Sequence, residues 1–448
     1  MAITNYYVHW DDGNDYSGAT FDDGEFDSGT FTLTKNGAFA DSQVHHWLYL
    51  DDDGSGEVTA GYYRVTTVND ANSVVLHADI RSGANDPTDV VCTQHDGSAV
   101  APWRSLQGGL DLVSQGADGD QFNVSDAAAQ VLSASLTLAR YGAPAGNKPL
   151  ALRGYTAAAN DGGMAEIDCS ENALWTTQYS HLGFIDLDMH SYGNNHGIYA
   201  LDYVCVHRCH IHRGASNPSG KYAVYLRNYS AIMGSRIYDV AAASGGCVWV
   251  TRYSTVMGNY IGTAMDWYYG VHAQMDDSFV TRNVILHAGA NSEGLNGSTV
   301  ATNNIVYCVG GGGGVGIKTS RLATNNVIVG ESGVGGYGVR VSGNPSLQGA
   351  NAFFNCTANN SATSAPLVDI TALDVALAAD PFVDAANDDF ALTEVAKAAL
   401  RNAGFPAQII GPLGSTPLYL TIGASQHGPD PGPVGGGGRR PRMREHGV

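Results

Sequence analysis

The chain has 448 residues, and its 23 basic and 43 acidic residues give a formal charge of −20. This charge argues against nucleic acid as a partner, because the phosphate backbone attracts basic surfaces. No stretch approaches the roughly 18 apolar residues of a transmembrane helix, so no membrane insertion is expected. Glycine supplies 57 residues and charged residues only 15%, which indicates many turns and few helices.

The N-terminal part of the chain predicts a cap at one end of a larger fold. Residues 1–18 predict an opening strand and turn without a secretory signal, so we expect synthesis in the cytoplasm. Residues 101–118 predict a capping helix, because Leu106 and Leu110 recur at helical spacing. Residues 19–100, inserted between these parts, predict a small all-β module. Its predicted strands are Phe31–Thr34, Trp47–Leu50, Tyr62–Val65 and Ser73–Leu76.

The inserted module contains one candidate metal loop. Asp51, Asp53 and Ser55 have the alternating spacing of the first half of a calcium-binding EF-hand loop. The twelfth position is Tyr62 instead of a bidentate Glu, and no helix is predicted on either side. A solvated hairpin loop is therefore the preferred interpretation and calcium binding the alternative. No other cofactor is expected.

A repeat within residues 119–360 organises the rest of the chain. The repeat unit has three fixed positions. It begins with an aliphatic residue, has a small or amide residue three positions later, and has a second aliphatic residue two positions after that. The leading aliphatic residues are spaced by 26, 24, 24, 20 and 22 residues. A period in the twenties with unequal steps predicts a stacked solenoid. The instances begin at Val206, Ile232, Val256, Val280, Val300 and Leu322.

The residue types in the repeat predict parallel strands. Short β-branched runs are separated by Gly and Asn, and helical periodicity is missing from this part of the chain. We expect a ladder of stacked amides, because Asn fits a tight turn and its side chain can bond to the same residue on the next rung. The predicted ladder residues are Asn259, Asn283, Asn303 and Asn325.

This pattern resembles the right-handed parallel β-helix of the pectate-lyase-like superfamily, of the type found in phage virion and tail proteins and in bacterial β-helix repeat proteins. The resemblance implies about ten rungs, stacked about 4.8 Å apart, and the crossover rule for parallel strands gives the right hand. The expected fold class is all-β, a right-handed parallel β-helix with an N-terminal capping helix, an inserted β module and a C-terminal closing segment. Activity does not follow from it, because one fold hosts many functions.

Counting back from each leading aliphatic residue predicts columns of outward-facing side chains. Tyr199, Tyr225 and Trp249 form one column, and Arg227 and Arg252 lie near it. Exposed aromatic rings at rung spacing suit the stacking of sugar rings, so these five residues are the predicted carbohydrate site. The same surface suits a contact with another subunit or with the C-terminal segment, and the sequence leaves these alternatives open.

Hydrolysis of a glycoside requires two carboxylates at a defined separation. The sequence offers five candidates, and no pair among them has clear catalytic spacing. Asp186 and Asp188 are predicted on one strand face, whereas Asp276 and Glu293 lie one rung apart but out of register. The candidate catalytic residues are Asp276, Asp277, Glu293, Asp186 and Asp188.

The C-terminal part predicts a closing segment followed by a docking tail. Residues 361–427 contain two characteristic short sequences, Asp380–Asp384 and Asp389–Leu392, followed by a predicted short helix from Glu394 to Arg401. This arrangement resembles the C-terminal segments of bacterial and phage β-helix proteins. Residues 428–448 are rich in Gly and Pro and carry arginines on an otherwise acidic chain, which predicts docking on a partner. The predicted docking residues are Arg439, Arg440, Arg442 and Arg444.

These features favour a structural or appendage protein of a virion, similar to a tailspike, fibre or decoration protein. Such a protein would assemble with neighbouring subunits and contact carbohydrate. The arginine tail, the missing export signal and the resemblance of residues 47–76 to small β modules of phage tail proteins support it. Expected partners are other virion subunits, a homotrimer included, and a polysaccharide; the expected location is a virion or other extracellular particle. The alternative is a polysaccharide lyase or glycoside hydrolase that acts on an acidic glycan along the β-helix face. A surface adhesin is the third possibility and would need an export route.

Overall fold

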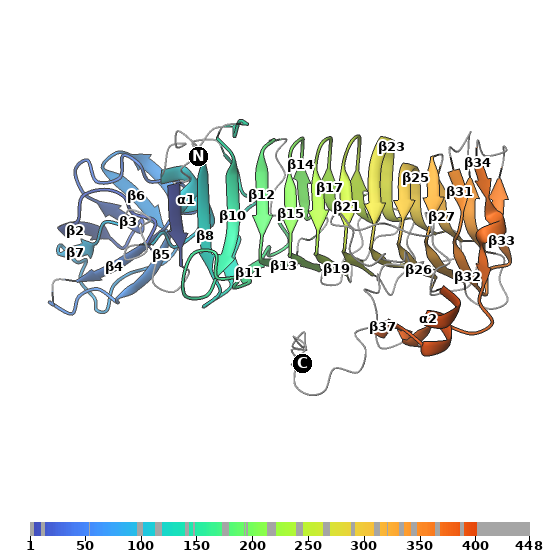
Figure 1. Cartoon of the computed structure of the whole chain (residues 1–448). Helices are drawn as coiled ribbons and strands as arrows, with labels where there is room; N and C mark the ends of the chain where they lie inside the picture. The colour runs from blue at the N-terminus through green and yellow to red at the C-terminus, as the bar shows by residue number, and fades with distance from the viewer. Residues whose placement is uncertain are drawn as a thin grey trace.

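The repeat winds into a parallel β-helix, as the computed structural model in Figure 1 shows. A small β-barrel lies at one end of the coil, and a closing segment lies beneath its other end. The predicted fold class is therefore confirmed. The structure describes residues 4–400 apart from short segments, namely 10–13, 53, 96–101, 113–118, 139–142, 147, 173–178, 192, 194–195, 213–220, 239–244, 263–268, 288–291, 309–313, 320, 331–335, 342–346, 363–367 and 386–388.

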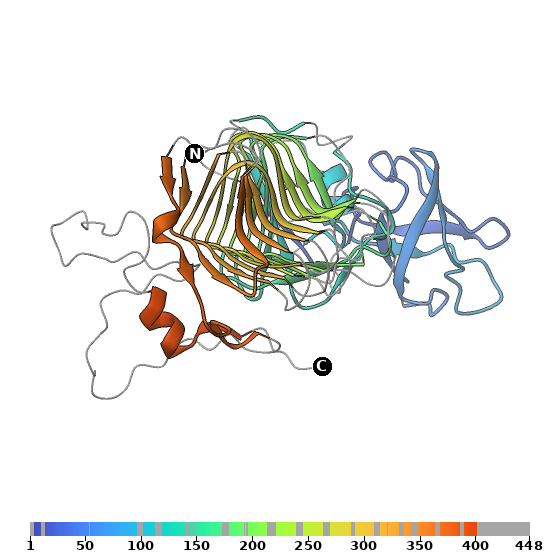
Figure 2. The same cartoon turned by 90° about the vertical axis from the view of Figure 1, so that its right-hand side faces the viewer.

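Three parallel sheets run along the coil, and equivalent strands of successive rungs stack on one another (Figure 2). The first sheet consists of β14 (Ile198–Ala200), β17 (Tyr222–Leu226), β20 (Gly246–Val250), the N-terminal halves of β23 (Tyr269–Thr281) and β25 (Glu293–Thr302), β27 (Val315–Thr319), β30 (Tyr337–Val341) and β33 (Ala358–Ala362). The second sheet consists of β1 (Thr4–Val8), β8 (Asp120–Ser125), β10 (Leu150–Tyr155), β12 (Leu182–Ile185), β15 (Cys205–His207), β18 (Ala231–Met233), β21 (Thr255–Met257), the C-terminal halves of β23 and β25, β28 (Leu322–Thr324), β31 (Leu347–Gly349) and β34 (Val368–Ile370).

The third sheet has 11 strands, one from each rung. The resemblance implied about ten rungs, so the observed number is slightly larger. It consists of β9 (Gln130–Val131), β11 (Ala165–Asp168), β13 (Leu187–His190), β16 (His210–His212), β19 (Arg236–Tyr238), β22 (Tyr260–Ile261), β24 (Val284–His287), β26 (Ile305–Cys308), β29 (Val327–Val329), β32 (Ala352–Phe354) and β35 (Val375–Ala376).

One column of side chains from the second sheet fills the interior of the coil. Its members pair in register from rung to rung and are at most 1% exposed: Val206, Ile232, Val256, Val280, Ala301 and Ala323. The prediction that Val300 and Leu322 belong to this column is wrong. Val300 pairs with the half-exposed Phe279 and points outward, one residue out of register.

The rung between β23 and β25 contains a local irregularity. Ala273 pairs with Gly297 and Ser278 with Thr299, so that four residues of β23 lie opposite one residue of β25. The spacing between paired residues falls from 24 (Ala273 to Gly297) to 21 (Ser278 to Thr299), and Ala301 therefore lies above Val280. A β-bulge of this kind changes which side chains point inward, because the side-chain period of a strand is two residues.

A ladder of buried carboxamides joins the rungs at the turn between the second and third sheets. Asn259 Nδ2 donates to Asn283 Oδ1 (3.0 Å), and Asn283 Nδ2 donates to Asn304 Oδ1 (3.0 Å). Asn326 and Asn351 continue the ladder with the same bond lengths. Each Oδ1 also accepts the backbone N–H of the preceding ladder residue at 3.0–3.1 Å.

The ladder corrects half of the predicted set. Asn259 and Asn283 occupy ladder positions, whereas the placement of Asn303 and Asn325 in the ladder is wrong. Those two residues instead adopt left-handed backbone conformations, with φ of 56° and 60°, at the turn just before the ladder position. Both belong to Asn-Asn pairs, and the shifted register places the second Asn of each pair inside the coil.

The inserted module is an antiparallel barrel with its own core. Its strands follow the spatial order β2-β3-β6-β5-β4-β7, with bounds β2 (Phe21–Asp27), β3 (Thr32–Thr34), β4 (Trp47–Asp52), β5 (Gly61–Asp70), β6 (Ser73–Leu76) and β7 (Val90–Cys92). Leu33, Leu48 and Val65 are fully buried within it. The helix α1 (Leu106–Leu112) instead buries Leu106 and Leu110 in the core of the coil.

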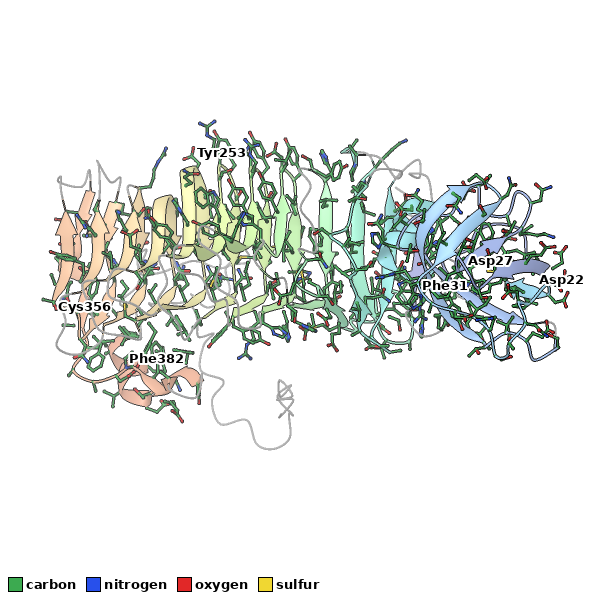
Figure 3. All side chains as sticks on the ribbon, turned by 180° about the vertical axis from the view of Figure 1, so that it is seen from behind. Asp22, Asp27, Phe31, Tyr253, Cys356 and Phe382 are labelled. Atoms are coloured by element: carbon green, nitrogen blue, oxygen red, sulfur yellow. The ribbon has the colours of Figure 1, made fainter. Side chains whose placement is uncertain are left out.

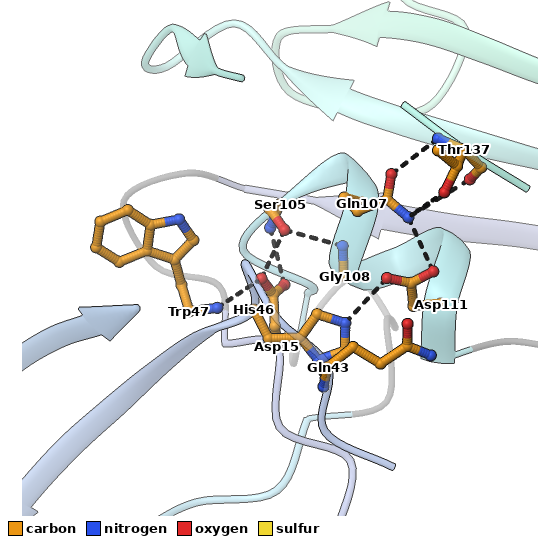
Figure 4. Close-up of polar contacts among 9 residues, drawn as sticks. All are labelled: Asp15, Gln43, His46, Trp47, Ser105, Gln107, Gly108, Asp111 and Thr137. Atoms are coloured by element: carbon orange, nitrogen blue, oxygen red, sulfur yellow. Dashed lines mark hydrogen bonds and ion pairs between the residues drawn. The ribbon is translucent and has the colours of Figure 1, made fainter. Parts of the chain in front are cut away.

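Buried polar groups join the barrel to α1 (Figure 4). The Asp15 carboxylate accepts hydrogen bonds from Trp47 N–H (3.0 Å) and from Ser105 N–H and Oγ–H (2.9 and 2.6 Å). Ser105 Oγ also accepts the N–H of Gly108 (2.9 Å), so Ser105 acts as the N-cap of α1. Asp15 lies so close to the helix that a Cβ on Gly108 would come within 2.2 Å of it. His46 and Asp111, both buried, form a second link at 3.2 Å.

The closing segment packs against the outer side of the third sheet. After the 3-10 helix η1 (Thr371–Leu373), it consists of β36 (Phe382–Asp384), β37 (Asp389–Leu392) and α2 (Glu394–Leu400). Phe382, Leu392 and Leu400 form a buried cluster with Ile305 and Val327 of the sheet. This hydrophobic contact covers the C-terminal part of the third sheet.

Replacement of the buried Asn304 by Ala should destabilise the coil far more than replacement of its neighbour Asn303 by Gly. Asn304→Ala leaves buried donors and acceptors of two rungs unpaired, which costs about 3 kcal/mol or more of unfolding free energy. Asn303→Gly keeps a left-handed backbone that glycine adopts readily, so a change below about 1 kcal/mol is expected. Urea unfolding of the two variants measures the difference, and equal losses would contradict the ladder.

Candidate functional site

A continuous outward column of side chains crosses the first sheet. Its members pair directly with one another on successive strands: Tyr199, Tyr225, Trp249, His272, Asn296, Lys318 and Arg340. The column is aromatic at one end and polar or basic at the other. We call the part from Tyr199 to His272 the aromatic column.

The rings of the aromatic column contact one another along the sheet. Tyr199 meets Tyr225 edge-on, with ring centroids 4.9 Å apart, and Tyr225 stacks on Trp249 at 5.2 Å. Trp249 in turn lies 4.3 Å from His272. Trp249 Nε1 and His272 Nδ1 are buried and have no hydrogen-bond partner among the described residues. Such unpaired groups are rare in proteins and can be satisfied by a bound molecule.

A pocket of about 270 Å³ lies beside the aromatic column. Four of the five predicted carbohydrate residues line it, and Trp249 stacks against one of them, so the structure brings the predicted set together. Arg227 and Arg252 follow β17 and β20, and both side chains are exposed. Neither guanidinium forms an ion pair with a described side chain. The lining residues are Tyr199, Tyr225, Arg227, Asn228, Thr251, Arg252 and Gln274.

Hydrogen bonds across three rungs fix the polar floor of this pocket. Thr251 Oγ1 donates to Asn228 Oδ1 (2.9 Å), and Asn228 Nδ2 donates to Asp202 Oδ1 (3.0 Å). A second row of stacked rings borders the pocket at the turn that follows the first sheet. Tyr203, Tyr229 and Tyr253 stack at 5.1–5.2 Å, and each has a left-handed backbone with φ of 56–59°.

At its polar end, the column forms a compact hydrogen-bonded group. Glu293 Oε1 accepts a bond from Lys318 Nζ (2.8 Å), and Glu293 Oε2 accepts one from Asn296. Asn296 and Lys318 pair directly on neighbouring strands, and Asn296 pairs with His272 on its other side. Of the five candidate catalytic carboxylates, Glu293 is the one that contacts members of this column, although it is not itself one of them.

The other candidate carboxylates lie outside this group, and two of them, Asp186 and Asp277, bind arginines. Asp186 is buried in the turn before β13 and contacts Arg208 at 2.6 Å, so the prediction that it shares a strand face with Asp188 is wrong. Asp188 points outward from the third sheet. Asp277 binds Arg321 at 2.9 Å. Asp276 lies in β23, and its side chain is outside the described residues. The described carboxylates therefore form no opposed pair around the pocket.

The sequence analysis did not identify a set of imidazoles that surrounds Asp188 on the third sheet. His212 contacts the Asp188 carboxylate at 2.9 Å and His210 contacts it at 3.7 Å, and a similar pair joins His190 to Glu166 at 2.9 Å. Burial alone would raise the pKa of Asp188, but the hydrogen bonds and charge of the two histidines hold it below its usual range. Among the described residues, no group of three or more His, Cys, Asp or Glu is placed to hold a metal ion.

Several predicted residues are only partly covered by the structure. Asp51 lies in β4 and Ser55 in the following loop, where its Oγ accepts the N–H of Glu57, while Asp53 is outside the described residues. Calcium binding there stays a prediction. The four tail arginines, Arg439, Arg440, Arg442 and Arg444, also lie outside the described residues. In the described part of the chain, neither α-helix has the length or apolar character of a membrane span.

No protein-family model and no curated protein sequence matches this chain. Among solved structures, the chain is similar to the crystal structure of pectate lyase Pel9A, with 13% sequence identity and a TM-score of 0.47. The similarity covers 75% of this chain and 94% of that one. A likeness at this level says nothing about the activity or the substrate of this chain.

Protonation of two partly buried histidines beside the aromatic rings, His196 and His272, should destabilise the fold in mild acid. Burial, assisted by the charge of Lys221, lowers the pKa of His196 to about 4, and burial with the charge of Lys318 does the same for His272. Between the ordinary value of 6.5 and about 4, the unfolded chain therefore binds protons that the folded chain does not. The unfolding free energy is unaffected above this window and falls by up to about 3 kcal/mol per histidine across it.

Urea unfolding at pH 7 and pH 4.5 measures this effect. His272→Gln should reduce the loss of stability relative to the unmodified chain, since carboxylate titrations contribute equally to both. An imidazole titration of folded His272 close to pH 6.5 by NMR would contradict the burial of this side chain.

Proposed function

We propose that this protein is a structural, appendage-type β-helix that binds an acidic polysaccharide along its first sheet. The observation that carries the proposal is the pocket in which Arg227 and Arg252 lie beside the aromatic column. Both guanidiniums are exposed and lack an ion-pair partner among the described residues. The chain has a formal charge of −20, so two neighbouring arginines without an acidic partner form a local positive region on a negatively charged protein.

The two kinds of side chain suit different parts of an acidic sugar. The apolar face of a pyranose ring stacks on an aromatic ring, and the aromatic column offers rings at rung spacing. A carboxylate or sulfate suits the planar guanidinium of Arg, which can donate two parallel hydrogen bonds. The acidic body of the protein repels an anionic polymer, so binding would be confined to the groove where the cations lie.

The structural part of the proposal follows from the sequence and is supported by the shape of the molecule. An elongated coil with a barrel at one end and a closing segment at the other suits a subunit of a tailspike, fibre or decoration on a virion or other extracellular particle. The barrel is fixed to the coil by the buried Asp15 and His46 contacts. Docking through the arginine tail onto a neighbouring subunit belongs to the same proposal.

A polysaccharide lyase or glycoside hydrolase is the second candidate. It is favoured by the group formed by Glu293, Lys318, Asn296 and His272, which continues the aromatic column and contains residue types used in acid–base catalysis. Binding without turnover is the preferred proposal, because Glu293 is paired with Lys318 and faces no second described carboxylate.

Removal of either pocket arginine should weaken the binding of acidic oligosaccharides. Arg227→Ala and Arg252→Ala each remove a charge-assisted contact and should raise the dissociation constant for oligogalacturonate at least about 10-fold. Calorimetry or affinity electrophoresis measures the change. Arg236→Ala is the matched control, because Arg236 is equally exposed but lies on the third sheet over Tyr238 and Tyr260. Equal effects of all three variants, or equal affinity for neutral dextran fragments, would contradict the proposal.

Incubation of the unmodified protein with acidic polysaccharides separates the two candidate functions. The binding role predicts no new reducing ends and no ultraviolet absorbance from unsaturated products. Turnover that is lost in Glu293→Gln, with binding retained, would replace the binding role by the enzymatic one.

A further inference from the structure

We infer that Ser191, His190 and Glu166 form a hydrolytic triad on the third sheet that cleaves neutral carboxylic esters. Ser191 Oγ lies 3.0 Å from His190 Nδ1, and His190 Nε2 lies 2.9 Å from Glu166 Oε1. Both distances are within hydrogen-bond reach, so the imidazole is held between a hydroxyl and a carboxylate. A nucleophile, a base and a group that orients the base are the parts of a serine triad, which is recognised by geometry instead of sequence position.

The Glu166 carboxylate determines which ring nitrogen of His190 can act as the base. An ionised carboxylate only accepts hydrogen bonds, so His190 Nε2 carries the proton that it donates to Glu166 Oε1. In the neutral imidazole Nδ1 is then the acceptor, and the Ser191 hydroxyl donates to it. The ring of His190 also stacks on His212, with centroids 5.4 Å apart, which restrains its orientation. The resting arrangement is therefore one from which Ser191 can lose its proton to His190.

The backbone at the end of β13 holds Ser191 in a strained turn. His190 is the last residue of the strand, and Ser191 follows it with a left-handed φ of 57°. Such a backbone is uncommon for residues other than glycine and is found preferentially at functional sites, as in the turn that carries the nucleophile of serine hydrolases. Gly193, two residues later, has a backbone N–H that no described residue accepts, and this N–H is available to the oxyanion of an ester intermediate.

The triad is open to solvent and lies apart from the proposed glycan pocket. The side chain of His190 is 21% exposed and that of Glu166 is 55% exposed. The closing segment covers the C-terminal part of the third sheet, whereas β11 and β13 lie near the other end of that sheet. Figure 3 shows Tyr253, which borders the glycan pocket, on the opposite side of the coil from Phe382, which packs on the third sheet. A substrate can therefore reach Ser191 without entering the pocket.

The triad supplies the proton transfers of ester hydrolysis. As Ser191 Oγ attacks the carbonyl carbon, its proton passes to His190 Nδ1, and the departing alcohol takes that proton when its bond to the carbonyl carbon breaks. Water then attacks the acyl-serine and gives a proton to His190, and Ser191 regains this proton as the carboxylic acid leaves. Glu166 stays ionised and stabilises the imidazolium in both steps. One ester and one water yield one alcohol and one acid.

The charges around Ser191 select the class of ester. Besides Glu166, Asp168 Oδ1 lies 3.9 Å from His190 Nδ1, and Glu171 donates its backbone N–H to the Ser191 carbonyl oxygen at 2.7 Å. These carboxylates repel phosphate and sulfate esters, on a chain whose formal charge is −20. A neutral carboxylic ester is therefore the expected substrate class.

A fluorophosphonate reagent and p-nitrophenyl acetate test the triad on the full chain. The reagent should modify Ser191, as located by peptide mass spectrometry. Ser191→Ala and His190→Gln should each lower kcat/KM for the acetate at least about 100-fold. Ser170→Ala is the matched control, because Ser170 is exposed and left-handed (φ of 45°) at the end of β11 but bonds to no histidine among the described residues. It should leave both labelling and turnover unchanged.

Glu166→Gln tests the positioning role of the carboxylate, because it removes the group that fixes the tautomer of His190. It should lower kcat at least about 10-fold and leave KM unchanged. p-Nitrophenyl phosphate should not be cleaved, and its cleavage would contradict the substrate class. An unlabelled Ser191 in the parent, or acetate turnover that survives both Ser191→Ala and His190→Gln, would overturn the inference. All variants should keep the unfolding temperature and the oligogalacturonate affinity of the parent, since this inference is independent of glycan binding.

Discussion

Buried carboxamides bonded from rung to rung are the constraint on which this structure depends. Within the ladder, each Asn side chain accepts from the side chain and backbone of one rung and donates to the backbone or side chain of others, as Asn283 and Asn304 illustrate. A buried amide that lost these partners would be costly, so only one register satisfies all of them. A second ladder, made of Ser230, Ser254 and Ser278, holds the turn on the other side of the second sheet.

Once the register is fixed, outward side chains fall into straight columns with distinct chemistry. The first sheet carries the aromatic column, followed by Asn296 and Lys318 beside Glu293, and the third carries the imidazoles around Asp188. The proposed glycan site in the pocket is therefore a consequence of this periodicity.

The sequence predicts the fold and the pocket residues because both depend on periodicity. It fails at Asn303 and Asn325, since each is followed by a second Asn, and the irregularity in β23 shortens the spacing between paired residues from 24 to 21. Val300 is more hydrophobic than Ala301 and was therefore predicted to point inward. In the structure Ala301 pairs with the inward-facing Val280 and takes that position. The serine ladder has the same 24-residue spacing and was detectable in the sequence. Ion pairs such as Glu293–Lys318 depend on side-chain geometry, which spacing alone does not give.

Hydrogen exchange of the Asn side-chain amides, followed by NMR in the native protein, tests the central claim most directly. The ladder predicts that the Nδ2 protons of Asn283, Asn304 and Asn326 exchange only when the coil unfolds, because each bonds to the next rung. The side-chain protons of Asn303 should exchange much faster. Slow exchange at Asn303 together with fast exchange at Asn304 would contradict the register, and with it the arrangement of every outward column.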